Sequence, residues 1–167
     1  MKIGTIALVA AASTCLAATP GYTQGPKRGG ILTYAVTSEA PTFDCHATTT
    51  YAAIHVLSPH YSLLVKIDGD NYPNIKPDLA ESWTISPDGL TYSFKLRSGV
   101  TFHDGSPFSS KDIRATFDRI RKPPAGIVSV RKAAFDDITT IDTPDANTVV
   151  MKLKAPDSEF LGLLALP

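Results

Sequence analysis

Two alternating stretches separated by a tight turn constrain the fold of this 167-residue chain more than any other feature. Residues 82–86 and 91–97 place apolar side chains at every second position, which is the period of a β-strand with one buried face. Between them, at 87–89, lies Pro-Asp-Gly, in which proline presets φ, aspartate bonds to nearby backbone and glycine relieves the turn. The sequence therefore predicts an antiparallel hairpin whose core residues are Trp83, Tyr92, Phe94 and Leu96.

Other segments carry strand patterns as well. Residues 31–37 (ILTYAVT) follow two glycines and are rich in β-forming residue types, which predicts a largely buried first strand. Residues 137–142 and 148–154 flank a turn at 144–147 and predict a second hairpin. The inward-facing residues of that hairpin are expected to be Val149, Met151 and Leu153.

Two segments show helical spacing. Ser109 and Asp112 stand at the spacing of a capping box, and apolar residues then recur until a proline pair, so a helix is predicted over 110–121. A second helical pattern covers 48–64, with a break or kink expected at Pro59. Strands and helices together indicate a mixed α/β fold.

The N-terminus has the pattern of a secretory signal peptide. Residues 1–18 combine Lys2 near the start, an alanine-rich apolar centre and small residues at the end. Residues 19–30 are interpreted as a mobile leader. Lipoprotein anchoring at Cys15 is not expected, because the residues before it do not form a box such as Leu-Ala-Gly. Cleavage would leave Cys45 as the only thiol, so we expect no internal disulfide and a buried Cys45.

The overall charge argues against one large class of function. Sixteen basic residues balance sixteen acidic ones, whereas a nucleic-acid binder needs a basic surplus to displace counterions from phosphates. No apolar run reaches the roughly 18 residues that a membrane-spanning helix requires. We therefore expect no nucleic-acid partner and no membrane span.

Three histidines lie close in sequence and could suggest a metal site. His46, His55 and His60 are accompanied by Asp44 and Cys45, and imidazole and thiolate are good ligands for zinc or nickel. Their spacing matches no recognised ligand pattern, and a proline interrupts the helix that would align the last two. No metal, cofactor or catalytic residue is therefore expected. A metal-dependent hydrolase built on the three histidines remains the alternative from another functional class.

A succession of motifs identifies a family by resemblance. The chain reads PDLAESW at 77–83, SPDGLTYSFKLR at 86–97, GVTFHDGSPF at 99–108, KDI at 111–113 and FDR at 117–119. This order of motifs closely resembles the N-terminal part of the bacterial family 5 extracellular solute-binding proteins, the peptide- and nickel-binding components of ABC importers.

The resemblance implies a type II periplasmic-binding-protein fold, an α/β architecture whose two lobes close on a ligand. Residues 31–67 would begin the first lobe, and residues 68–167 would form the small mixed α/β extra domain of this family, truncated at its C-terminus. The apolar run at 160–166 agrees with that reading, because we expect such a run to be exposed unless further chain covers it.

The resemblance also implies a function. A periplasmic, monomeric, non-enzymatic protein would capture di- or oligopeptides and deliver them to ABC permease subunits in the inner membrane. FDCH at 43–46 resembles the family's DPH segment, after which backbone pairs with an extended peptide. Carried over, the ligand-binding residues are Thr49, Thr50 and Tyr51. A receptor for a nickel chelate, an oligosaccharide or an opine stays open, and we expect the fragment alone not to bind.

Overall fold

The computed structural model describes residues 28–167, so the predicted signal peptide at 1–18 and most of the predicted leader at 19–30 lie outside the described residues. The chain divides into two units, 1–34 and 35–167. All the helices and strands of the described residues, from α1 to α3, belong to the second unit. Among residues 28–167, no helix combines the length and the apolar character needed to cross a bilayer.

The second unit is built on a four-stranded antiparallel sheet with the order β3-β4-β6-β5. Its strands are β3 (Ala80–Ile85), β4 (Thr91–Leu96), β5 (Ile138–Asp145) and β6 (Thr148–Leu153). Both predicted hairpins are confirmed, and they join through β4 and β6. Phe94 at the centre is opposite Trp83 on one side and Val149 on the other.

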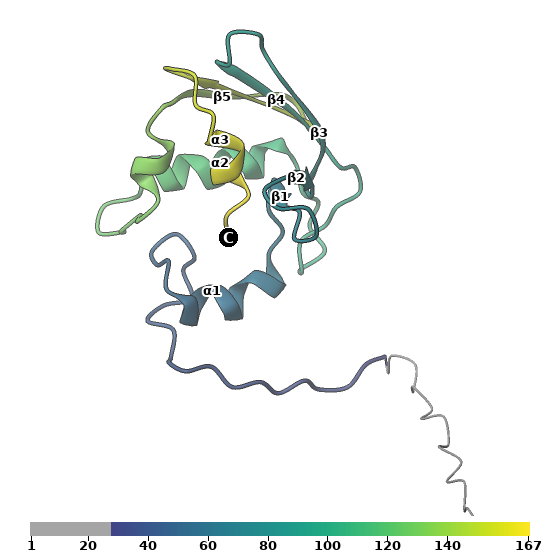
Figure 1. Cartoon of the computed structure of the whole chain (residues 1–167), viewed down its shortest axis with the longest axis vertical. Helices are drawn as coiled ribbons and strands as arrows, with labels where there is room; N and C mark the ends of the chain where they lie inside the picture. Colours follow the sequence, from purple (N-terminus) through teal and green to yellow (C-terminus); the bar gives the residue numbers. More distant parts are fainter. Residues whose placement is uncertain (1–27) are drawn as a thin grey trace, which may run out of the picture. The chain divides into compact units, whose positions relative to one another are not determined.

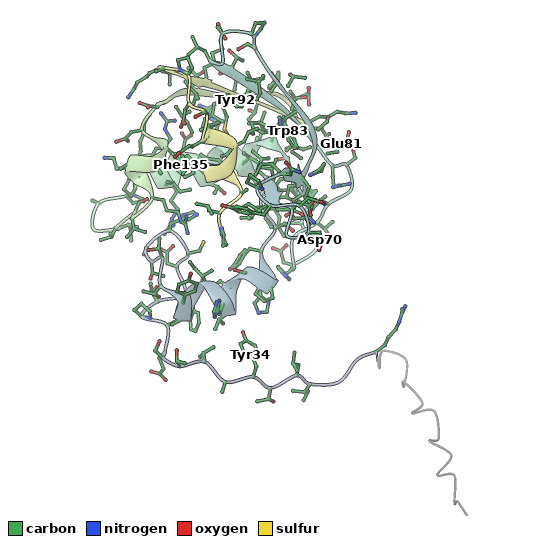
Figure 2. The ribbon with its side chains drawn as sticks, in the orientation of Figure 1. Tyr34, Asp70, Glu81, Trp83, Tyr92 and Phe135 are labelled. Atoms are coloured by element: carbon green, nitrogen blue, oxygen red, sulfur yellow. The ribbon has the colours of Figure 1, made fainter. Side chains whose placement is uncertain are left out.

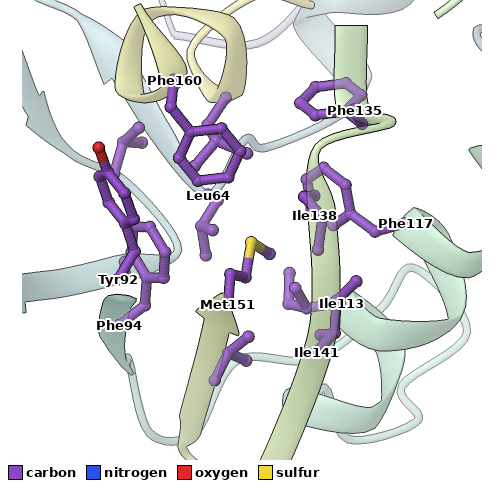
Figure 3. Packing of buried hydrophobic residues seen from close by; sticks show 14 of the residues in the cluster. Leu64, Tyr92, Phe94, Ile113, Phe117, Phe135, Ile138, Ile141, Met151 and Phe160 are labelled. Carbon is purple, nitrogen blue, oxygen red and sulfur yellow. The ribbon is translucent and has the colours of Figure 1, made fainter. Parts of the chain in front are cut away.

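One face of the sheet is buried under helices (Figure 1). β4 and β6 alternate along their length, so Tyr92, Phe94, Val149 and Met151 are buried, whereas Lys95 on the opposite face is exposed. Helix α2 (Ser110–Arg121) contacts β5 and β6, and α3 (Phe160–Leu164) contacts the small β1 strand. Figure 3 shows the side chains of these elements meeting in one apolar cluster, which also includes Phe135 of the short 3₁₀ helix η2 (Lys132–Phe135).

Helix α2 has the predicted bounds and the predicted capping box. The Asp112 carboxylate accepts a hydrogen bond from the Ser109 backbone N–H at 2.8 Å and thereby satisfies a donor that the helix leaves free. Its apolar face buries Ile113, Phe117 and Ile120. The helix ends at Arg121, just before the proline pair that the sequence indicated.

A small hairpin precedes the main sheet. Strands β1 (Val65–Ile67) and β2 (Ile75–Pro77) pair antiparallel, and the turn between them contains the Asp68 side chain. That carboxylate accepts hydrogen bonds from Asn71 at 2.9 Å and from Lys76 at 2.9 Å, which hold the pKa of Asp68 at about 2. Sequence patterns indicated the turn but not these strands, because three residues are too few to establish a period.

The helical pattern over 48–64 gives a shorter helix than predicted. Helix α1 spans Tyr51–Leu57, and the 3₁₀ turn η1 (Ser58–His60) contains Pro59, so the expected break is confirmed. Residues 61–64 are not helical, because the carbonyl oxygens of Leu63 and Leu64 accept hydrogen bonds from the backbone N–H groups of Leu79 and Ala80.

Three expectations about burial are wrong. Residues 31–37 form no strand, and Ile31 is 97% exposed, because a strand needs a neighbouring backbone and none of the described strands pairs with this segment. Trp83 is half-buried, since β3 is an edge strand (Figure 2). Cys45 is also half-buried, because it lies in an open loop before α1.

The apolar C-terminal run is the clearest correction. This run was expected to be exposed unless further chain covered it, but it forms α3, in which Phe160 is 2% exposed and Leu164 is 4% exposed against residues described here. The physical reason is that Phe160 and Leu164 pack into the same apolar cluster as the buried side chains of β4, β6 and α2. Only Leu166 near the end of this run remains 45% exposed.

Candidate functional site

A cavity of about 470 Å³ lies between the 45–64 segment and the elements that cover the sheet. Its volume lies within the range of small-molecule pockets. The wall is mostly apolar and is made by α1, α2, η2 and α3, including Ala53, Leu57, Ile113, Phe117, Phe135 and Leu164. Polar groups also line it, among them Cys45, His46, His103 and Arg131.

Cys45 contributes the one thiol of the described residues to this cavity. Burial, followed by the negative charge of Asp44, raises the pKa of the Cys45 thiol. The thiol is therefore protonated at neutral pH and is a poor nucleophile. Nearby, Arg131 donates a hydrogen bond to the backbone carbonyl of Pro167.

A charged cluster ties the loop before α1 to helix α2. The Arg119 guanidinium donates to both carboxylate oxygens of Asp44, at 3.1 and 2.6 Å. Its Nη1 also lies 2.5 Å from Nδ1 of His46. The hydrogen bond from Arg119 lowers the pKa of Asp44, while burial and then the Arg119 charge lower the pKa of His46. His46 can accept this hydrogen bond only in its neutral form.

The loop after this cluster contains the three residues predicted to contact ligand. Thr49 and Thr50 are exposed, and Tyr51, the first residue of α1, is 77% exposed. Thr50 uses its backbone locally: its N–H donates to the Thr48 hydroxyl at 3.2 Å, and its carbonyl accepts from Ala53 and Ile54. The ring of Tyr51 contacts His55, with centroids 5.2 Å apart. None of the three residues lines the cavity.

The histidines do not assemble the metal site considered above. His46 faces Arg119, His55 contacts Tyr51, and His60 lies in η1 at the cavity. Within residues 28–167, no three His, Cys, Asp or Glu side chains are grouped as metal ligands. The Arg119 guanidinium contacts both Asp44 and His46, so a cation already lies against these two side chains.

Sequence reasoning placed Asp44 and Arg119 in motifs but did not pair them. The available signal was the presence of an acidic residue in FDCH and a basic residue in FDR. Opposite charges 75 positions apart give no periodicity, so their contact appears only once the chain is folded.

An apolar concavity bordered by a few polar groups is the usual form of a small-molecule site, so the described part of the chain contains a candidate binding site. Comparison with known proteins identifies its family. The chain belongs to the bacterial extracellular solute-binding proteins of family 5, whose middle-region model matches residues 74–167. Proteins of this family are solute-binding components of ABC transporters and are not enzymes.

Individual relatives agree with this assignment. A protein of Brucella ovis named as an ABC transporter peptide-binding protein is 46% identical over 108 residues, covering 65% of this chain and 20% of that protein. The binding protein AgaA of A. tumefaciens R10, solved with agropinic acid, is 32% identical with a TM-score of 0.71, over 77% of this chain and 25% of that one.

A third comparison involves a peptide complex. DppA of Helicobacter pylori, solved with the peptide STSA, is 27% identical with a TM-score of 0.67, over 76% of this chain and 28% of that one. The chain thus contains part of the type II periplasmic-binding-protein fold, as predicted, and spans between 20% and 28% of the length of these proteins.

Proposed function

We propose that this chain is part of a periplasmic solute-binding protein that captures di- or oligopeptides for an ABC permease in the inner membrane. The observation that carries the proposal is membership of family 5 across residues 74–167. The relative of Brucella ovis, named as peptide-binding, supports peptides as the ligand class. The predicted signal peptide supports export.

The proposal extends to the organisation of the protein. Residues 31–67 would begin the first lobe and residues 68–167 would belong to the extra domain. The protein would act as a monomer and without enzymatic activity. We propose that peptide backbone pairs with the exposed segment Thr49–Tyr51.

The hydrogen bonds of this segment indicate which groups would pair. Thr50 has both backbone groups engaged in its own turn, whereas Thr49 makes no backbone hydrogen bond within residues 28–167. A bound peptide would therefore pair with the backbone of Thr49, while the exposed Tyr51 ring would lie against a peptide side chain.

Titration calorimetry of the protein encoded by the complete reading frame tests the function. We expect some members of a di- to pentapeptide library to bind. If none of the peptides gives a heat of binding, the peptide assignment is overturned. Thr49→Pro removes the backbone donor, whereas Thr49→Ala retains it and serves as the matched control. We expect Thr49→Pro to weaken peptide binding and Thr49→Ala to bind like the wild type.

A non-peptide solute is the second candidate ligand. The structure of AgaA with agropinic acid supports it, because that protein shares this part of the fold at 32% identity. The same calorimeter, loaded with agropinic acid or with a nickel–histidine chelate, separates this candidate from the first. Heat from one of these solutes, together with silence across the peptide library, would replace peptide with that solute.

A further inference from the structure

Arg119 of helix α2 bonds to the loop before α1. Arg119 donates from Nη1 and Nη2 to the two oxygens of Asp44, at 3.1 and 2.6 Å, which is the two-pronged geometry that makes such pairs directional. Its side chain is 37% exposed and that of Asp44 is 29% exposed, so the pair is partly shielded from water. A third contact, from Nη1 to Nδ1 of His46, uses the same guanidinium.

Asp44 passes this restraint on to its own loop. Its Oδ1 accepts the Arg119 hydrogen bond and also accepts one from the His46 backbone N–H at 3.0 Å. Its carbonyl accepts a hydrogen bond from Ala47 at 3.0 Å. Because one carboxylate closes the turn and bonds the helix, loss of Arg119 would leave that turn attached to itself but not to α2.

Local hydrogen bonds continue from this turn to the segment proposed to bind ligand. Thr48 is 6% exposed, and its hydroxyl oxygen accepts a hydrogen bond from the Thr50 backbone N–H at 3.2 Å. Among the described residues, a backbone hydrogen bond also ties this loop to the rest of the unit: Val130 N–H donates to the His46 carbonyl at 3.1 Å. The loop thus has few anchors, and Arg119 supplies the charged one.

We propose that Arg119 is a positioning residue for ligand capture: by clamping Asp44 and His46 onto α2, it holds the backbone of Thr49–Tyr51 in the conformation that receives ligand. The inference rests on the proposed function, because it assigns Thr49–Tyr51 to the ligand. A backbone receptor must be rigid before the ligand arrives, since ordering it on binding costs affinity.

Cys45 offers a direct reporter of the clamp, because it lies between the two clamped residues. In the whole chain carrying Cys15→Ser, Cys45 is the only thiol, and its labelling by a maleimide measures local opening of the loop. We expect Arg119→Ala to accelerate labelling about tenfold, as for loss of a charge-assisted anchor. Arg119→Lys keeps the positive charge but loses the two-pronged guanidinium, so its labelling rate should lie between those of the wild type and Arg119→Ala.

Arg114→Ala is the matched control on the same helix. Among residues 28–167 its guanidinium pairs within α2, with Asp118 at 3.4 Å, so its loss should leave Cys45 labelling unchanged. Unchanged labelling in Arg119→Ala would overturn the inference, as would equal acceleration in Arg114→Ala. If Arg119→Ala does not fold, Asp44→Asn removes the same pair from the loop side and answers the same question.

Titration of the complete protein with a binding peptide separates positioning from stability. We expect Arg119→Ala to weaken peptide binding about tenfold with the midpoint of thermal unfolding little changed, and Arg119→Lys to restore part of the affinity. Faster Cys45 labelling with unchanged peptide affinity would overturn this inference alone. Failure of the wild type to bind any peptide would overturn the proposed function, and with it the link to ligand.

Discussion

The ring of Tyr92 on β4 lies edge-on to the ring of Phe160 on α3, with centroids 4.8 Å apart and an interplanar angle of 61°. The Tyr92 hydroxyl also donates to the backbone carbonyl of Asp157, at 3.1 Å, just before this helix. Figure 3 shows both rings beside Leu64 and Phe94. Through these contacts the C-terminal segment becomes part of the core, because β4 supplies both an apolar surface and a hydrogen-bond donor.

Removal of the Phe160 ring should strongly destabilise the unit. Phe160 is 2% exposed, and truncation of a buried phenylalanine to alanine costs about 3–5 kcal/mol, since it leaves a cavity. Urea denaturation of Phe160→Ala measures the loss. Tyr92→Phe is the control: it removes only the hydrogen bond to Asp157 and should cost about 0.5–1.5 kcal/mol. A loss below 1 kcal/mol in Phe160→Ala would show that α3 is not part of the folded core.

Gly89 in the β3–β4 turn should resist substitution. Its φ is +71°, a region that L side chains rarely adopt, and a Cβ there would lie 3.2 Å from Cβ of Pro156. We expect Gly89→Ala to lower the free energy of unfolding by about 1–2 kcal/mol. Gly69→Ala provides the comparison, because an added Cβ at Gly69 meets nothing within 4 Å. Similar unfolding midpoints for the two variants would contradict this expectation.

Acidification should weaken the fold, first through His46. Burial and the Arg119 charge lower the pKa of His46 below its usual 6.5. As the pH falls, the imidazole is therefore protonated in the unfolded chain at a higher pH than in the folded protein. The free energy of unfolding should therefore fall as the pH drops below about 6.5. Asp44 adds a second loss at pH values below its usual 3.8, because Arg119 lowers the pKa of that carboxyl.

The pH prediction is measured by urea denaturation from pH 8 to pH 3. His46→Gln removes the titrating group but retains a polar side chain, so its stability should depend less steeply on pH between 6.5 and 5. If the free energy of unfolding of His46→Gln depends on pH as steeply as that of the wild type, groups other than His46 cause the loss of stability.

The 167-residue chain by itself should bind no peptide measurably. Its relatives are about three times as long, and a ligand enclosed in a cleft needs two walls. Calorimetry of this chain with the peptide library used for the complete protein should give no heat. Micromolar binding would place a sufficient site within these residues, and the cavity lined by Phe117 and Leu164 would then be the first place to mutate.

Local sequence determined the elements whose signals lie within a few residues. The Ser109–Asp112 capping box and the following proline pair set the two ends of α2. Both are local effects, because the box bonds groups three residues apart and a proline lacks the backbone N–H that would continue the helix. Alternation set β4 and β6, since only one register buries Phe94 and Met151 together. The motif order was enough to identify the family, and the match over 74–167 confirms it.

Tertiary structure decided everything that depends on distant partners. Residues 31–37 have a strand's composition but form none here, because a strand's hydrogen bonds come from another part of the chain. The run at 160–166 is covered by β4 and its neighbours, and Asp44 meets a guanidinium 75 positions away. Periodicity shows which face of an element is apolar, but burial and charge pairing depend on which surface folds against that face.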